Sequence, residues 1–368
     1  MRLIKKIFAL GFLVISSSIV FIGFYIGIFA FSAAQPSLSN PSSLPSTEAP
    51  GDQIISIHKG STSKEISKLL ESKGIITSSQ RFYWLGKFAS FWKKIKTGEY
   101  QVSPGMTPIE IFSTLTSGIS ISHPITIREG ENMYEVASDI ESKGLGTKIN
   151  FLNLCKSPDF IKTLGFKGFT PSNLEGYLFP DTYNFNRAQN TEEMIRNMVK
   201  RFHSFWTAER ERKREESGLT RHQIITLASM IEKETGATQE RPLISSVFYN
   251  RLRKKMRLQS DPTTIYGIWS RYRGNLHKSD LLEETPYNTY TISGLPLGPI
   301  GNPGLEAIDA ALNPAQTDFL YFVSHNDGTH QFSRSLEEHN EAVRRFQLDP
   351  NAKVGKSWRD LRKISNAK

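Results

Sequence analysis

The sequence predicts an α+β protein: a single N-terminal transmembrane helix, a small α/β subdomain, and a larger domain of mixed helices and strands. Three observations predict this fold class. Residues 7–31 are almost wholly apolar and carry no charge. A strand–turn–helix pattern recurs three times between residues 57 and 144. The rest of the chain alternates apolar segments of helical period with turn-rich stretches and short strand-like runs.

The uncharged segment 7–31 is long enough to cross a bilayer core of about 30 Å. Three cations precede it, and no Lys or Arg follows until Lys59. By the positive-inside rule, the tail of residues 1–6 is cytoplasmic and everything after the segment is exported. A cleaved signal peptide is the alternative, but the segment is much longer than the usual apolar signal core of about 7–15 residues. We therefore expect a permanent single-pass anchor.

Composition limits the cellular compartments and the classes of partner that fit this chain. Residues 32–52 are rich in Ser and Pro and predict a flexible tether. Cys155 is the only cysteine, which excludes an intrachain disulfide and a cysteine metal cluster. An exported protein without disulfides is consistent with the bacterial envelope, so we expect the folded part on the periplasmic or extracytoplasmic side of a bacterial inner (cytoplasmic) membrane.

The net charge of +10 has two interpretations, attraction to an acidic polymer or membrane surface and an ordinary soluble surface. The chain contains no nucleic-acid motif, and nucleic acid is a poor partner for an exported, tethered domain. An anionic glycan or peptide–glycan polymer fits the compartment better. The three histidines near the C-terminus match no metal-ligand spacing, and no dinucleotide or phosphate-binding fingerprint is present, so we expect neither a metal nor a cofactor.

A repeated element occupies the first exported region. The pattern apolar-x-x-Gly-x-x-x-x-Glu-apolar starts at Ile57, at Val102 and at Ile127. Each copy predicts a short strand, a glycine turn and an amphipathic helix, and three copies are too few for a solenoid. The rhythm resembles small glycan-binding LysM modules, although plain α+β scaffolding has the same pattern. We expect a LysM-like subdomain over residues 53–120.

An apolar helix in the second half carries the most informative residue. Its start is marked by a capping box at Thr220 and Gln223. At about 100° per residue, Glu232 falls in line with Ile225 and Ala228. A carboxylate on an apolar face is costly unless it is paired or protonated, and that cost raises its pKa and suits it to general acid catalysis. The alternative is a buried glutamate tied to an Arg or Lys for structure.

Glu234 does not form a facing pair with Glu232. Two residues along a helix correspond to about 200°, so the two side chains point to opposite sides. Glu234 lines up with Leu227 and Met230 and is an equally good candidate for burial. Periodicity therefore nominates two carboxylates without choosing between them, and any second catalytic group must come from another part of the chain.

Turn-rich segments supply the other candidates. Residues 171–183, which include Glu175, combine aromatic rings with carboxylates as sugar-binding clefts do; an aromatic loop that fills the core is the alternative. Gln259 and Asp261 lie on an expected turn, and Tyr287 and Asn288 precede a Gly/Pro-rich loop of the kind that forms cleft walls. Asp261 and Asn288 could equally cap their own turns.

Six segments of the second half carry longer motifs. They are residues 174–182 (LEGYLFPDT), 227–235 (LASMIEKET), 246–252 (SVFYNRL), 256–263 (MRLQSDPT), 287–290 (YNTY) and 294–296 (GLP). Together they resemble the YceG-like endolytic murein transglycosylases, and the similarity extends from the anchor to about residue 346. The resemblance implies a catalytic domain over residues 121–349, followed by a basic tail at 350–368. It also implies that Glu232, the first acid of Glu-Lys-Glu, is catalytic. Ser260 stands where the family often has Thr.

The resemblance implies a membrane-anchored lyase. Its substrate would be the glycan strands of peptidoglycan, cut internally at the β-1,4 bond between MurNAc and GlcNAc without hydrolysis, leaving a 1,6-anhydro-MurNAc end. Such cleavage would terminate the elongation of nascent strands, beside peptidoglycan synthases of the elongation or division machinery. Gln259, Asp261, Tyr287, Asn288 and Glu175 would bind the sugar, because their motifs accompany the catalytic one.

A single acid suits this chemistry. A hydrolase normally needs two carboxylates, whereas a lytic transglycosylase uses the muramic acid 6-hydroxyl as an intramolecular nucleophile and benefits from its proximity. Two alternatives remain. One is a muramidase-type hydrolase with Glu175 or Asp261 as the second carboxylate, and the other is a non-catalytic peptidoglycan-binding scaffold in which Glu232 is structural.

Overall fold

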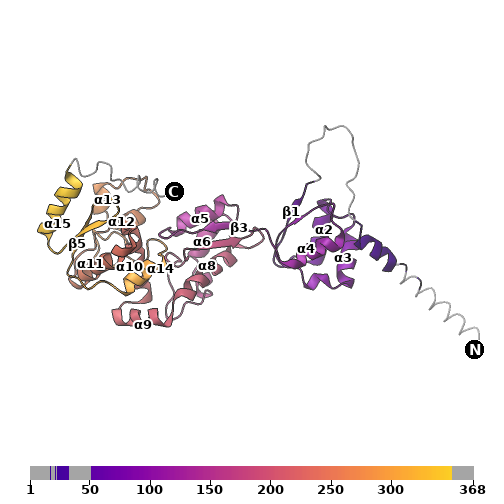
Figure 1. Cartoon of the computed structure of the whole chain (residues 1–368), viewed down its shortest axis with the longest axis horizontal. Helices are drawn as coiled ribbons and strands as arrows, with labels where there is room; N and C mark the ends of the chain where they lie inside the picture. The colour runs from indigo at the N-terminus through magenta and orange to yellow at the C-terminus, as the bar shows by residue number, and fades with distance from the viewer. Residues whose placement is uncertain (1–16, 18–20, 22, 33–50, 350–368) are drawn as a thin grey trace, which may run out of the picture. The chain divides into compact units, whose positions relative to one another are not determined.

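The computed structural model describes residues 17, 21, 23–32 and 51–349 (Figure 1). The expected cytoplasmic tail, most of the expected transmembrane segment, nearly all of the Ser/Pro-rich linker and the basic C-terminal tail lie outside these residues. Within the described part of the chain, no helix is both long and apolar enough to cross a membrane. The chain divides into two units, Met1–Pro124 with Asn184–Asn190, and Ile125–Tyr183 with Thr191–Lys368.

The first unit is built around a two-stranded antiparallel sheet. Strand β1 (Gln53–Ile57) pairs with β2 (Gly98–Val102), and Ile55 lies opposite Tyr100. Both side chains are fully buried. The helical elements are α2 (Ser63–Ser72), α3 (Ser79–Phe88), the short 3-10 turn η1 (Phe91–Lys93) and α4 (Pro108–Ser117). Their apolar faces form one core with the buried apolar residues of the strands.

The recurring glutamate of the repeat is a helix-capping residue. In each copy it occupies the third helical position, where its carboxylate accepts the N-cap N–H while the N-cap side chain accepts its own N–H. The three capping boxes are Thr62 with Glu65, Thr107 with Glu110, and Asn132 with Glu135. The helix of the third copy is α5 (Met133–Ser142), which belongs to the second unit. The repeat is therefore a local folding signal that recurs in both units.

The second unit is mainly helical, with two short strand pairs. Its elements in chain order are β3 (His123–Thr126), α5, α6 (Lys148–Cys155), α7 (Pro158–Lys162), β4 (Thr182–Phe185), α8 (Thr191–Phe205), α9 (Ala208–Ser217), α10 (Arg221–Glu234), the 3-10 turn η2 (Thr238–Glu240), α11 (Arg241–Arg253), α12 (Asp261–Gly267), α13 (Lys278–Leu282), α14 (Leu305–Leu312), β5 (Tyr321–Ser324), β6 (His330–Ser333), α15 (Leu336–Val343) and the π-helical turn η3 (Arg344–Leu348). β3 pairs with β4, and the division between the units passes through both strands.

Two local sequence signals correspond to structure in this unit. The segment Asn326-Asp327-Gly328, which is typical of a hairpin turn, joins β5 and β6, which pair antiparallel, and Asn326 and Gly328 both have positive φ. The predicted capping box of Thr220 and Gln223 begins α10. Both signals are local in sequence, so they need no knowledge of the tertiary structure.

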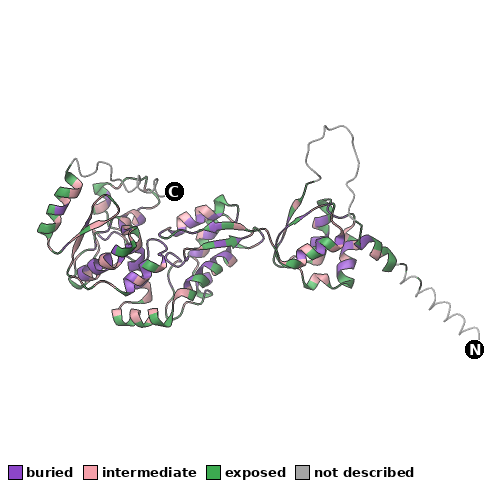
Figure 2. Ribbon diagram, viewed as in Figure 1, coloured by how far each residue is buried: buried purple, intermediate pink, exposed green. Residues whose placement is uncertain are grey.

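Helix α10 is the central element of the second unit. Every residue from Ile224 to Ile231 is buried, and α11, α12 and α14 pack against it. In Figure 2 α10 is mostly purple, whereas the outer helices α9 and α15 are mostly green and pink. Because the helix is surrounded, any polar group near its C-terminal end must find its partners inside the protein.

Candidate active site

Glu232 lies in the last turn of α10 with 6% of its side chain exposed. One carboxylate oxygen, Oε1, accepts a hydrogen bond from Nη2 of Arg241 at 2.8 Å. The other, Oε2, accepts the backbone N–H of Gly304 at 3.0 Å. Gly304 is the N-cap of α14, so the carboxylate also faces the positive end of that helix dipole. The predicted position of Glu232 on the buried face is confirmed.

Burial raises the pKa of Glu232 above its usual value, because removing a carboxylate from water disfavours the charged form. The Arg241 cation and the Gly304 N–H oppose this effect, and the nearby carboxylates of Glu129 and Glu306 reinforce it. The net direction is upward, which favours a carboxylic acid that can donate a proton nearer neutral pH.

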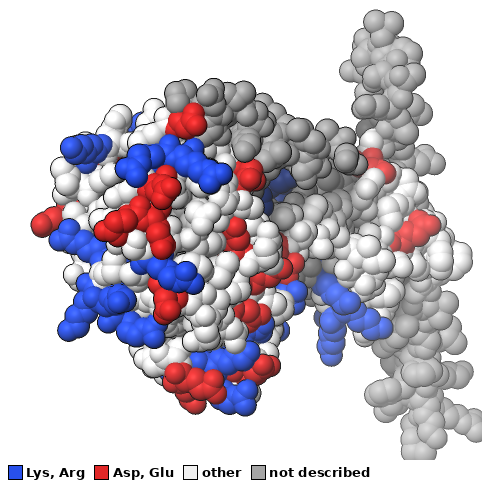
Figure 3. All heavy atoms as spheres, turned by 60° about the vertical axis from the view of Figure 1, so that its left-hand side comes forward, with Lys and Arg blue, Asp and Glu red and all other residues white. Residues whose placement is uncertain are grey.

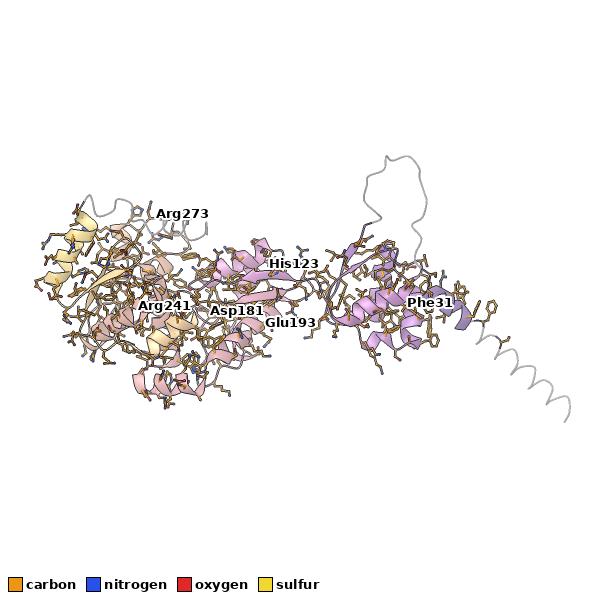
Figure 4. The ribbon with its side chains drawn as sticks, in the orientation of Figure 1. Phe31, His123, Asp181, Glu193, Arg241 and Arg273 are labelled. Atoms are coloured by element: carbon orange, nitrogen blue, oxygen red, sulfur yellow. The ribbon has the colours of Figure 1, made fainter. Side chains whose placement is uncertain are left out.

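Arg241 serves three carboxylates at once. It begins α11, and its side chain is 6% exposed (Figure 4). Besides Glu232 it pairs through Nη1 with Glu306, and its Nη2 lies 3.7 Å from Oε2 of Glu129. Glu129 and Glu306 are about half exposed. One cation cannot neutralise three anions, so the cluster favours binding a proton, and the buried member has the least water to stabilise its charge.

Two glycine-containing loops enclose the carboxylate. A Cβ at Gly304 would overlap the carboxylate of Glu129, and a Cβ at Gly301 would lie 2.6 Å from the carbonyl oxygen of Gly130. Fully buried Asn302 joins the same loops. Its carbonyl accepts the Gly130 N–H at 2.8 Å and its side-chain amide donates to the carbonyl of Glu131 at 2.7 Å. These contacts fix Glu129 beside Glu232.

Glu234 is partly buried, on a different side of α10. Its Oε1 accepts a hydrogen bond from the hydroxyl of Ser260 at 2.5 Å, and burial raises its pKa to about 7. The described contacts include no hydrogen bond or ion pair between Glu234 and Glu232, as the angular spacing predicts. Glu234 therefore has the partners of an internal structural carboxyl group.

Glu175 lies beneath the surface, with 1% exposure. Both carboxylate oxygens accept the N–H of Met133, the first residue of α5, at 3.0 Å. Oε2 also accepts the Tyr266 hydroxyl at 2.8 Å. Burial raises the pKa of Glu175 to about 8. The acid of the 174–182 motif therefore holds the N-terminus of α5. Its carboxylate is not exposed and does not face a sugar.

Tyr287 and Asn288 have different environments. The half-buried ring of Tyr287 lies 4.8 Å from that of Tyr266, and burial raises its pKa to about 12. Asn288 is fully buried. Its amide nitrogen donates to the carbonyls of Asp280, Leu281 and Glu283, and its oxygen accepts the Thr264 hydroxyl. The expectation that Asn288 lines a cleft does not fit this placement, whereas the alternative role in holding its loop does.

Gln259 and Asp261 are both exposed, at the start of α12. Gln259 has a positive φ of 48°, an uncommon conformation for a non-glycine residue, and Asp261 Oδ1 accepts the Tyr290 hydroxyl at 2.6 Å. Both side chains remain candidates to contact a ligand. Among the described contacts, no hydrogen bond or ion pair joins Glu232 to any of the five predicted substrate-binding residues.

Sequence reasoning missed three members of the cluster: Glu129, Arg241 and Glu306. A buried Glu tied to an Arg or Lys was one of the two interpretations of Glu232, but the sequence did not identify Arg241 as that partner. Glu129 immediately precedes the glycine of the third repeat copy. Gly130 has a positive φ and therefore marks a turn. A carboxylate next to such a turn is only a weak indication of a site residue.

The fold and the site together define an α+β protein whose candidate site has a buried carboxyl group with a raised pKa, Glu232, beside the half-exposed carboxylate of Glu129. Comparison with known proteins places the chain more narrowly. The model of the YceG-like family matches residues 55–345. The chain therefore belongs to the YceG-like family.

Individual relatives agree. The endolytic murein transglycosylase of Bacillus subtilis (strain 168) is 35% identical over 313 residues, covering 81% of this chain and 86% of that protein. The endolytic murein transglycosylase of Streptococcus pneumoniae serotype 2 is 28% identical over 326 residues, covering 78% of this chain and 57% of that protein. A 2.6 Å crystal structure of a YceG-like protein from Listeria monocytogenes matches with a TM-score of 0.55 and 32% identity, covering 79% of this chain and 98% of that one. The predicted mixed α+β class fits this fold.

Proposed function

We propose that this protein is an endolytic murein transglycosylase, a lyase that cuts the β-1,4 bond between MurNAc and GlcNAc inside peptidoglycan glycan strands. The observation that carries the proposal is Glu232, a buried carboxyl group with a raised pKa at the position of the family's catalytic acid. Two relatives of this chain bear the name of that activity.

The chemistry needs one proton that leaves Glu232 and returns to it. The protonated carboxyl donates to the glycosidic oxygen, and the bond between that oxygen and C1 of MurNAc breaks with the electron pair on oxygen. The carboxylate then takes the proton of the MurNAc 6-hydroxyl, whose oxygen forms the new bond to C1. The product is a 1,6-anhydro ring, and no water is consumed. Arg241 and the Gly304 N–H orient the carboxylate for both transfers.

A muramidase-type hydrolase is the second candidate, and Glu129 is the observation that favours it. Glu129 and Glu232 both lie within 4 Å of the same Arg241 nitrogen, and Glu129 is half exposed. It is therefore better placed than Glu175 or Asp261 to act as a second carboxylate. In the transglycosylase, the same carboxylate would instead face the positive charge that develops at C1.

Digestion of purified peptidoglycan in water enriched in ¹⁸O separates the two functions. Mass spectrometry of the released muropeptides should give anhydro ends without heavy oxygen. Reducing ends that carry ¹⁸O would establish the hydrolase. Binding of peptidoglycan with no new ends of either kind would establish the non-catalytic scaffold.

The remaining expectations are part of the same proposal. Residues 7–31 anchor the chain in the bacterial inner membrane, and the folded units act on its outer side. The first unit is a LysM-like module that holds glycan, and peptidoglycan synthases are the partners whose nascent strands the enzyme terminates. The uncharged segment and the positive residues before it support the anchor. The strand–helix pattern of the first unit supports the module.

A further inference from the structure

The first unit contains a basic segment without acids. From residue 73 to residue 98 the sequence has six Lys and Arg residues and no Asp or Glu. The same stretch contains six aromatic residues, two of them tryptophans. By contrast, Figure 3 shows acidic and basic side chains interspersed over the visible face of the second unit. The acid-free segment therefore differs in charge pattern from that face of the second unit.

Helix α3 presents part of this segment to solvent. Its inner face buries Phe82 and Leu85, while Trp84 and Phe88 on the outer face are 39% and 67% exposed. The two exposed rings stack on each other with centroids 5.7 Å apart. The Lys87 ammonium lies 4.6 Å from the centroid of the Trp84 ring. Exposed Lys93 and Lys94 follow directly in η1 and after it. We call Arg81, Trp84, Lys87, Phe88, Lys93 and Lys94 the α3 face.

The α3 face adjoins the end of the uncharged N-terminal segment. The guanidinium of Arg81 lies 5.4 Å from the ring centroid of Tyr25 and 5.2 Å from that of Phe29. Phe29 and Ala30, at the end of a helical segment that begins before residue 23, are buried in the core of the first unit, and Phe31, labelled in Figure 4, follows them in a turn. The end of the expected anchor is thus packed on α3, so a bilayer that held the anchor would lie next to the exposed rings.

We propose that the α3 face binds the surface of a bilayer containing anionic phospholipid; this inference rests on the proposed membrane anchor. Tryptophan and lysine or arginine are the side chains that suit the interface, because the rings enter the headgroup level while the cations meet lipid phosphates. The exposed aromatic pair could also stack on a sugar, but the contact of Arg81, on the same helix, with Tyr25 and Phe29 of the anchor segment favours lipid. The face would add a second attachment that fixes the orientation of the first unit on the membrane.

A fluorescent probe on the α3 face tests the inference in the full-length chain. Cys155 is the only cysteine and is buried, so Phe88→Cys provides a single accessible thiol for an environment-sensitive dye. Ile119→Cys is the matched control, since Ile119 is 83% exposed in the same unit and outside the α3 face. The unsubstituted chain reports any labelling of Cys155. Each labelled protein is reconstituted into vesicles of phosphatidylcholine with and without phosphatidylglycerol.

The dye at position 88 should shift its emission to the blue and be quenched by spin-labelled headgroups, more strongly with phosphatidylglycerol, while the dye at 119 stays water-like. Lys93→Glu with Lys94→Glu should weaken both effects. If the protein floats with the vesicles but the dye at position 88 has the emission of a dye in water, the α3 face does not bind lipid, and the proposed anchor is still supported. If the protein floats with neither kind of vesicle, both the proposed anchor and the lipid contact of the α3 face are wrong. A dye that soluble glycan strands shield and vesicles do not makes the face a sugar site and also overturns the proposal.

Discussion

Arg241 and Glu232 form a buried ion pair at 2.8 Å in which each side chain is only 6% exposed. The pair is unbalanced, because the same guanidinium also serves Glu306 and lies near Glu129. A buried ion pair is weak evidence for a stabilising role, since desolvation offsets much of its attraction. Its combination with a raised carboxyl pKa fits a proton-transfer site better.

Glu232→Gln should keep the fold and abolish cleavage. The amide keeps the shape of the side chain but can neither donate nor accept the required proton, and the loss of an acid/base group typically lowers turnover about 10²–10⁴-fold. Glu234→Gln is the matched control on the same helix and should retain far more activity. Release of muropeptides from purified peptidoglycan measures both. Near wild-type cleavage by Glu232→Gln would show that the acid lies elsewhere.

Arg241→Gln and Glu306→Gln should move the pH profile in opposite directions. Arg241 lowers the pKa of Glu232 and Glu306 raises it. The reaction begins with the protonated acid, so activity falls as pH rises through that pKa. Loss of Arg241 should therefore move the alkaline limb of kcat to higher pH, and loss of Glu306 should move it to lower pH. If the alkaline limb moved in the same direction in both variants, it would not report the titration of Glu232.

The buried position of Glu232 could be predicted because helical periodicity is local. An uninterrupted apolar run predicts a buried helix, and a capping box marks its start. The partners of Glu232 could not be predicted in the same way. Gly304 lies 72 residues further along the chain, and its N–H reaches the carboxylate only after α14 packs on α10. No period or spacing in the sequence encodes that contact.

Asn288 and Glu175 are buried in the structure, whereas their residue types and turn positions predict side chains that face a ligand. Polar side chains on turns were expected to face a ligand, because turns lie at the surface. Here the Gly/Pro-rich segments fold inward, and their buried carbonyl and N–H groups must be satisfied. Asn288 meets that need with three backbone carbonyls, and Glu175 meets it with the N–H of Met133. Sequence alone does not distinguish a side chain that serves the backbone from one that serves a substrate.

Asn288→Ala should lower the melting temperature and Asp261→Asn should not. The fully buried amide of Asn288 donates to three carbonyl oxygens, and leaving buried polar groups unpaired costs about 1–3 kcal/mol. Asp261 is exposed and holds one tyrosine hydroxyl, so its amide should change stability little. If Asp261 contacts the sugar, turnover of Asp261→Asn falls at unchanged melting temperature. Calorimetry together with cleavage rates distinguishes a structural role from a substrate-binding role. An Asn288→Ala variant that is stable but inactive would show that Asn288 acts in the cleft.

The anchor should resist salt. Apolar insertion of residues 7–31 is not screened by ions, unlike attachment through the cations of the α3 face. The protein should therefore stay in the membrane fraction after washing at high ionic strength and leave it only with detergent. Sequencing of the mature N-terminus provides the control. A chain that begins near Gln35 would establish a cleaved signal peptide instead.

Stability should decline as pH rises from about 4.5 to about 8, because two carboxyl groups removed from water hold protons in the folded state. Burial raises the pKa of Glu175 to about 8 and that of Glu234 to about 7, from an ordinary value of 4.5. Both folded values lie above the unfolded value, so the folded state binds more protons within this range. Stability therefore falls with increasing pH there, and below about 4.5 both states are protonated and the effect vanishes.

Glu175→Gln and Glu234→Gln should each flatten this decline, since the amide is neutral at every pH. Glu284→Gln, at an exposed position, is the matched control and should leave the slope unchanged. Denaturant unfolding at several pH values between 4.5 and 8.5 gives the free energy of unfolding for each variant. If the slope of the wild-type protein survives in both variants, the two carboxyl groups are not the protons that the folded state retains, and the slope must be assigned to other groups, with Glu232 the first to test.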